Sequence, residues 1–142
     1  MSEIIPYILA ILVGIFTSVE ATMNSQLGKI VTPKLATLHS LITGLVLILI
    51  INISSGSLRQ YGKVFYVKPY WLFGGIFGAL IVYFVTKIVP YLGITVTLTM
   101  VMASEVLGSF YIDTFIFKNE KLDIIKIFGA LLILTGVYFI SE

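Results

Sequence analysis

Five long runs of apolar residues make up most of this sequence, and each is long enough to cross a lipid bilayer. A helix rises about 1.5 Å per residue, so about 20 apolar residues cross a hydrocarbon core of about 30 Å. Inside that core every backbone N–H and C=O group needs a partner, which a helix supplies within its own segment. The runs therefore predict five transmembrane helices, at about residues 4–29, 33–53, 69–88, 93–117 and 122–140.

The four prolines lie at the ends of these predicted helices. Pro6 falls in a first turn, where a missing N–H costs nothing. Thr32 followed by Pro33 is typical of an N-cap and a first helical residue. Pro69 begins the third predicted helix, and Pro90 is expected to end it. The agreement between helix breakers and hydropathy supports the five boundaries.

The composition places the whole chain in a membrane, as one five-helix domain over residues 1–142. Its hydrophobic fraction is 58% and its charged fraction is 11%, whereas a soluble domain is roughly a quarter charged. The predicted fold class is an all-α integral membrane protein of the plasma (inner) membrane. A formal net charge of +2 gives no reason to expect a nucleic-acid partner.

Several kinds of chemistry lack the residues that they need. There is no cysteine, which excludes disulfides and thiolate metal sites, and a single histidine cannot form a multi-histidine site within one chain. No nucleophile–base arrangement or phosphate-binding glycine loop is present either. We therefore expect no metal, no cofactor and no enzymatic activity; an intramembrane enzyme stays open as an alternative without positive support.

Glu20 places a carboxyl group near the middle of the first predicted helix. An ionisable group at that depth is costly and is a functional candidate by default. Thr17 and Asn24, three and four residues away, share its helix face. These residues predict a substrate- or proton-binding stripe, because a carboxyl group there can exchange a proton for a cation. The alternative is a protonated, structural carboxyl group that hydrogen-bonds to a neighbouring helix.

Other polar residues in the spans are secondary candidates. Glu105, near the centre of the fourth predicted helix, is a second acid or gate element, with a structural role equally open. Asp113 lies nearer the span's end, where an interfacial position is favoured. His39 is a proton-relay candidate, although a lone histidine is more often packed. Tyr83 is an aromatic candidate for binding a cation, with core packing as its alternative.

Four glycines predict close helix contacts. Gly74 and Gly78 have the small-xxx-small spacing of the third predicted helix, and Gly129 and Gly136 lie on one face of the fifth. Small residues at such spacing let two helix backbones approach each other in a membrane. We expect these positions to serve helix packing.

Basic residues are distributed unequally between the two predicted sides. The side of the N-terminus holds six of them: Arg59, Lys63, Lys68, Lys118, Lys121 and Lys126. The other side holds three: Lys29, Lys34 and Lys87. The positive-inside rule then predicts a cytoplasmic N-terminus and an external C-terminus. The bias is small, so insertion in both orientations stays open.

An odd number of spans places the two termini on opposite sides of the membrane. Many secondary transporters consist of inverted repeats, with the site near the bilayer midplane at their interface. A five-helix unit has the size of one such half, and this sequence contains no internal repeat. The predicted partners are the lipid bilayer and a second copy or paralogue in an antiparallel dimer.

The order of several short motifs resembles the YdcZ-type, five-helix family of the drug/metabolite transporter superfamily. The motifs are Glu20 to Gly28, Pro33 to Gly44, Trp71 to Ala79, Val89 to Gly93, and Gly129 to Gly136, with Glu105 and Asp113 between the last two. The resemblance implies a bundle related to small multidrug resistance transporters, with a fifth helix added, that works as a homodimer or heterodimer. Glu20 and Glu105 depart from it, because the family often has glutamine there, so a proton role is inferred from this sequence alone.

Together these features predict half of a secondary transporter that moves a small polar or cationic metabolite by alternating access. Proton coupling would act through Glu20, with proton and substrate in competition, while Asn24 and Thr17 orient the substrate. The competing hypothesis is a non-transporting membrane assembly or regulatory subunit, which would bury Glu20 in a dry helix contact. A passive channel is a third possibility, and it would conduct without saturation.

Overall fold

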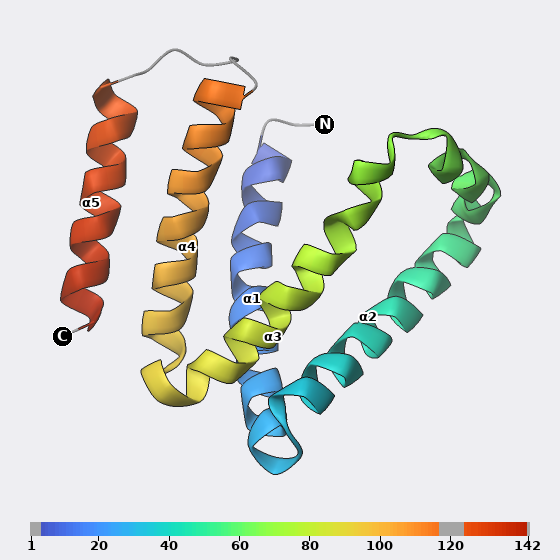
Figure 1. Ribbon diagram of the computed structural model, residues 1–142, viewed down its shortest axis with the longest axis horizontal. Helices are drawn as coiled ribbons and strands as arrows, with labels where there is room; N and C mark the ends of the chain where they lie inside the picture. Colours follow the sequence, from blue (N-terminus) through green and yellow to red (C-terminus); the bar gives the residue numbers. More distant parts are fainter. Residues whose placement is uncertain (1–3, 117–123, 142) are drawn as a thin grey trace. The chain divides into compact units, whose positions relative to one another are not determined.

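The computed structural model describes residues 4–116 and 124–141, except for seven side chains: Asp113, Ile116, Ile124, Lys126, Ile127, Ala130 and Ser141. The described secondary structure is helical throughout, which confirms the predicted all-α class (Figure 1). The long helices are α1 (Ile4–Ile30), α2 (Pro33–Ser55), α3 (Gly74–Leu92), α4 (Ile94–Tyr111) and α5 (Ile124–Ser141). The chain divides into two units, Met1–Pro90 and Tyr91–Glu142, and each is described by itself.

Four helical segments have the length and hydropathy of membrane spans: Ile4–Ile30, Pro33–Ser55, Pro69–Leu92 and Ile94–Tyr111. In α5 the described apolar stretch, Leu131–Ile140, is shorter than a span. The predicted boundary between the fourth and fifth spans, at residues 117–122, lies outside the described residues. So do Lys118, Lys121 and the side chain of Lys126, which are three of the six basic residues on which the predicted orientation depends. The orientation therefore stays a prediction.

A two-residue turn joins α1 to α2, and its sequence explains its shape. Thr32 is extended, and its Oγ1 accepts a hydrogen bond from the Leu35 N–H at 3.2 Å, so it caps α2 as its position before Pro33 predicts. The two helices meet at this turn and diverge from it, and α3 returns toward the same end of the unit (Figure 1).

Small side chains make the contact among α1, α2 and α3 possible. Ser25 is 2% exposed, Ala36 is fully buried and Thr86 is 1% exposed. A Cβ atom added at Gly28 would lie 3.2 Å from Thr86 Cγ2 and 3.5 Å from the Pro33 Cα. Among the glycines that the structure describes, Gly28 is therefore the one whose added Cβ atom would come within 4 Å of another helix.

The four glycines predicted to serve helix packing differ from Gly28, because each has open space beside it. A Cβ atom at Gly74, Gly78, Gly129 or Gly136 would meet no described atom of this chain within 4 Å. No contact within the described chain thus requires glycine at these positions. Their packing against a second chain stays a prediction.

The C-terminal end of α3 corrects one expectation. Pro90 lies inside the helix, which continues to Leu92, so the prediction that Pro90 ends it is wrong by two residues. Pro90 removes only the one N–H that would bond to the Thr86 carbonyl. The helix ends where Gly93 adopts a φ of +77°, a conformation that glycine reaches without strain.

Three shorter helical segments accompany the long helices. Between α2 and α3 the chain forms two short 3₁₀ helices: η1 (Ser57–Tyr66), which lies in the predicted connection, and η2 (Pro69–Phe73), which replaces the beginning of the predicted third α-helix. After α4 it continues as a π-helix, η3 (Ile112–Ile116), where the sequence predicted one uninterrupted helix to residue 117.

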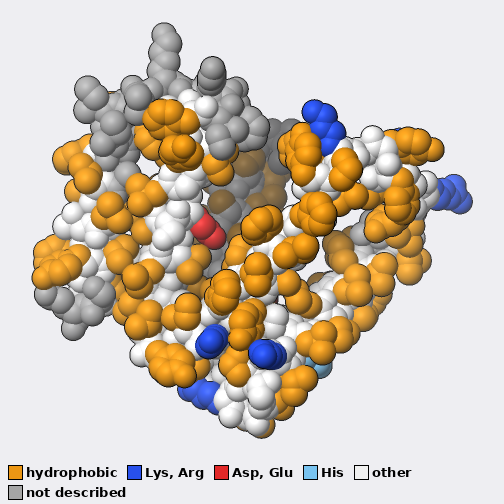
Figure 2. Space-filling view, viewed as in Figure 1, with side chains coloured by type: hydrophobic (Ala, Val, Ile, Leu, Met, Phe, Trp, Pro, Cys, Tyr) orange, Lys and Arg blue, Asp and Glu red, His pale blue; other side chains and the backbone are white. Residues whose placement is uncertain are grey.

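The surface of the first unit is apolar along the helices and basic at their ends. Figure 2 shows hydrophobic side chains over most of the visible helices, with lysine and arginine side chains near the two ends of this unit. Lys29 and Lys34 flank the α1–α2 turn, whereas Arg59, Lys63 and Lys68 lie in the α2–α3 connection. An apolar band between charged ends is the pattern of a protein that crosses a bilayer.

Candidate functional site

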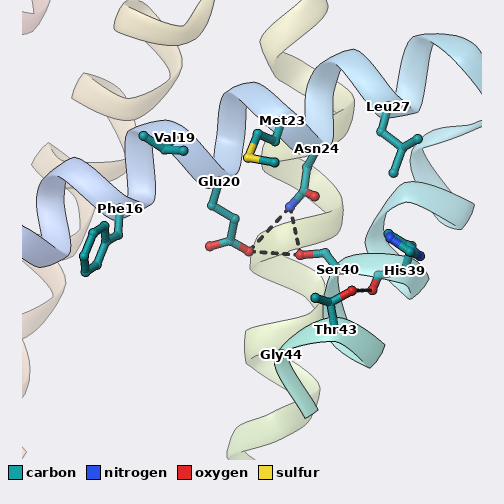
Figure 3. A pocket seen from close by; sticks show the side chains of 10 residues that line it. All are labelled: Phe16, Val19, Glu20, Met23, Asn24, Leu27, His39, Ser40, Thr43 and Gly44. Carbon is teal, nitrogen blue, oxygen red and sulfur yellow. Dashed lines mark hydrogen bonds between the residues drawn. The ribbon is translucent and has the colours of Figure 1, made fainter. Parts of the chain in front are cut away.

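Three polar side chains from α1 and α2 converge in the first unit. The Asn24 amide donates to Ser40 Oγ at 3.1 Å and to Glu20 Oε1 at 3.4 Å. The Ser40 hydroxyl in turn donates to the same Glu20 oxygen at 3.3 Å. Figure 3 shows the three side chains pointing toward one another across the two helices. We call Glu20, Asn24 and Ser40 the polar cluster.

Local sequence explains why the cluster forms. Glu20 and Asn24 are four residues apart on α1 and therefore lie on one helix face. The short turn brings the beginning of α2 back along the end of α1. Ser40 lies eight residues after the Thr32 cap, so it is in this first part of α2. Asn24 is 7% exposed, which means that its amide needs the partners that it has.

The polar cluster borders an open pocket of about 720 Å³ between α1 and α2. Its lining is drawn in Figure 3: Phe16, Val19, Glu20, Met23, Asn24 and Leu27 from α1, and His39, Ser40, Thr43 and Gly44 from α2. A volume of this size suits a small organic molecule. The pocket is therefore the candidate site, and its lining comes from one unit of the chain.

The lining combines apolar and polar groups. Phe16, Val19, Met23 and Leu27 supply hydrocarbon and aromatic surface along α1. Glu20 supplies the one carboxyl group, and its Oε2 makes no hydrogen bond to any residue that the structure describes. A carboxylate oxygen without a partner can bind a proton or accept hydrogen bonds from a cation, which makes the site chemically suited to an amine with an apolar body.

A second, smaller pocket of about 50 Å³ lies on the α3 side of α1. It is lined by Thr17, Glu20, Ala21 and Asn24 from α1 and by Ile81, Val82, Val85 and Thr86 from α3. Glu20 and Asn24 thus border both pockets. The same two polar side chains face α2 on one side and α3 on the other.

Of the other predicted site residues in the first unit, two line a pocket and one does not. Thr17 lines the smaller pocket, and its hydroxyl donates to the Val13 carbonyl of its own helix at 2.9 Å. His39 lines the larger pocket, and its ring has no hydrogen bond to a described residue. Tyr83 lines neither of these pockets, and its ring lies 5.6 Å from that of Phe84.

The other two acidic candidates belong to the second unit. Glu105 is exposed on α4 and has no hydrogen-bond partner among the residues described there. Asp113 lies in η3, and its side chain is outside the described residues.

Sequence reasoning missed two residues of the first unit. Ser40 lies within the motif Pro33 to Gly44 and was not singled out as a candidate, yet it completes the polar cluster. Gly28 was noted only as part of a motif, yet it sits against Thr86. The sequence offered one signal for Ser40: it lies two helical turns after the Thr32 cap, close enough to the turn for its side chain to reach α1.

The apolar helices, the charged ends and the polar pocket between helices define an α-helical, multi-pass membrane protein. A family model described as "Putative inner membrane exporter, YdcZ" matches residues 5–139, and the chain belongs to this YdcZ family. The match confirms the resemblance drawn from the motifs and supports a transporter of the inner membrane. Searches of curated proteins and of solved structures find no significant match.

Proposed function

We propose that this chain is half of a proton-coupled exporter of small amines, working by alternating access as a dimer. The observation that carries the proposal is the polar cluster at the edge of the 720 Å³ pocket, with Glu20 as its acid. The family description adds the direction, since it names an exporter. Neither the described side chains nor the family points to catalysis.

The pocket gives each residue of the cluster a role. When the site opens to the cytoplasm, Glu20 loses a proton to water and its carboxylate binds the ammonium group of the substrate. Asn24 and Ser40 hold Oε1 in place, which leaves Oε2 for the substrate. When the site opens outward, a proton binds Glu20 and displaces the amine. One proton thus enters for each amine that leaves.

Two features support a dimer. The pocket between α1 and α2 is open on one side, so a second chain can complete its wall. Glu105 is an exposed acid on a helix with the composition of a membrane span. An acid in that setting is costly against lipid, and a partner chain would cover it. The partner is a second copy or a paralogue in the opposite orientation.

The exposure of Glu20 to an open pocket also favours transport over a scaffolding role. A structural carboxyl group would be enclosed in a dry contact between helices, whereas Glu20 is exposed within this chain and borders a pocket on each side. A scaffolding role would predict unchanged binding of small molecules when Glu20 is replaced.

The test is capacitively coupled current from purified protein in proteoliposomes, with a panel of small primary and quaternary amines. We expect saturable currents from the native chain and none from Glu20→Gln. Ser18→Ala is the matched folding control, because its hydroxyl bonds only to the Gly14 carbonyl of its own helix and lines neither pocket. Currents that rise without saturation would indicate a channel, and currents that survive in Glu20→Gln would overturn the assigned role of Glu20.

A further inference from the structure

The connection between α2 and α3 joins the ends of two segments that have the length and hydropathy of membrane spans. If both segments cross a bilayer, the connection lies at one of its surfaces. Gly56 ends α2 with a φ of 69°, and its N–H donates to the Ile53 carbonyl at 3.1 Å. The chain then forms η1, which packs against the end of α2, and η2, which leads into α3.

This connection carries positive charge without any acid to neutralise it. Arg59, Lys63 and Lys68 are all exposed. The sequence contains no aspartate or glutamate between Glu20 and Glu105, so no carboxylate lies within the connection or in either helix that it joins. The positive charges of this segment are therefore available to an anionic partner from outside the chain.

Aromatic rings surround these charges. Tyr61 and Phe65 make an edge contact with ring centroids 6.4 Å apart, and Tyr66 is 90% exposed. The Lys68 ammonium group lies 5.9 Å from the centre of the Tyr70 ring, a cation–π distance that holds the charge near the ring. Amphipathic rings favour the depth of phospholipid head groups, so rings at this depth would place the basic groups close to lipid phosphates.

We propose that residues 57–71 form a binding surface for the phosphate groups of anionic phospholipids. Charge complementarity identifies the occupant, because three unneutralised basic groups and a set of interfacial rings meet at head-group depth. The attraction of one basic residue to an anionic bilayer surface corresponds to about a five-fold preference for binding anionic over neutral lipid. The proposal concerns the membrane around the protein and does not depend on which substrate is transported.

Trp71 makes the proposal measurable. It is the single tryptophan of the chain, it belongs to η2 and it is 65% exposed. The full-length protein would be reconstituted in bilayers that contain brominated phosphatidylglycerol or brominated phosphatidylcholine at equal mole fraction. Bromine quenches indole fluorescence at short range, so the two lipids report which head group occupies the surface beside Trp71. We expect a preference for the anionic lipid of at least about five-fold.

A matched pair of triple variants separates a local site from net charge. Arg59→Gln, Lys63→Gln and Lys68→Gln together should reduce the preference to about one-fold. Lys29→Gln, Lys34→Gln and Lys87→Gln remove the same charge from the other end of the unit and should leave it unchanged. Raising the salt concentration with the native protein should also reduce it, which keeps the test valid if a variant fails to insert. Equal quenching by both lipids in the native protein, or equal effects of the two triples, would overturn the proposal.

Discussion

The amide nitrogen of Asn24 lies 3.1 Å from the hydroxyl oxygen of Ser40, and this contact joins α1 to α2 at the edge of the larger pocket. Because Asn24 also donates to Glu20, its position controls both the acid and the neighbouring helix. A cluster of this kind holds a carboxylate in one orientation before a ligand arrives. Preorganisation of that sort increases affinity, since less ordering is needed when the ligand binds.

Glu20→Gln should abolish the pH dependence of amine binding. If a proton and the amine compete for one carboxylate, acidification should weaken the apparent affinity, by at most about ten-fold per pH unit for a single competing proton. Glutamine has no proton to exchange, and its binding should be weak at every pH. Isothermal titration calorimetry of the detergent-solubilised protein at several pH values measures both effects. A native affinity that is flat with pH would contradict proton competition.

Ser40→Ala should weaken amine binding by about five-fold, the equivalent of about 1 kcal/mol for one hydrogen bond to the carboxylate. The substitution removes the hydroxyl that donates to Glu20 at 3.3 Å. Ser18→Ala removes a serine hydroxyl from α1 that serves only its own helix, and it should have no effect. Equal affinities of the two variants would show that Ser40 does not position Glu20.

Asn24→Ala should lower both thermal stability and amine affinity, because it removes two hydrogen bonds and leaves a buried gap between α1 and α2. We expect a loss of about 1–3 kcal/mol in the free energy of unfolding. Asn52→Ala is the control, since its amide bonds only to the Ile48 carbonyl of its own helix. Thermal unfolding in detergent compares the two, and a larger effect at Asn52 would contradict the assigned role of Asn24.

Gly28→Ala should destabilise the first unit despite the higher helix propensity of alanine. The new Cβ would lie 3.2 Å from Thr86 Cγ2, so Thr86 must shift. Gly14→Ala, on the same helix, meets nothing within 4 Å and should instead be neutral or stabilising by up to about 1 kcal/mol.

Thr86→Ser provides the corresponding rescue test, because it removes the Cγ2 methyl group that the new Cβ would meet. In a double-mutant cycle, Thr86→Ser should recover part of the stability lost in Gly28→Ala. Additive effects of the two substitutions would show that the contact between α1 and α3 does not limit the side chain at residue 28.

Much of the fold followed from local patterns in the sequence. The apolar runs predicted the helical class, and Thr32 with Pro33 predicted the beginning of α2, because capping depends on adjacent residues. The end of α3 was predicted wrongly from Pro90, because one missing N–H near a helix end costs little. The helix instead ends before Gly93, where the backbone has a positive φ. Local chemistry thus predicted the beginning of α2 but neither the end of α3 nor the 3₁₀ segment before it.

The site was predictable only along a single helix. Glu20 and Asn24 share a face of α1 by spacing alone, so their proximity could be predicted. Their contact with Ser40 depends on how α2 folds back, which no pattern within α1 encodes. Gly28 was missed for the same reason: its neighbour Thr86 lies on α3, and motif spacing in one helix does not identify a contact with another.

The two-residue turn between α1 and α2 has a mechanical consequence. α1 contains 27 residues and is therefore about 40 Å long, with the turn at one end. A rotation of about 5° at this vertex displaces the far end of the helix by about 3.5 Å, but moves Asn24, about 9 Å from the vertex, by less than about 1 Å. Glu20, ten residues from the end of α1 and about 15 Å from the vertex, would move by about 1.3 Å. A wide opening at the distal end is therefore compatible with a nearly constant contact between Asn24 and Ser40, whereas the hydrogen bonds to Glu20 would change.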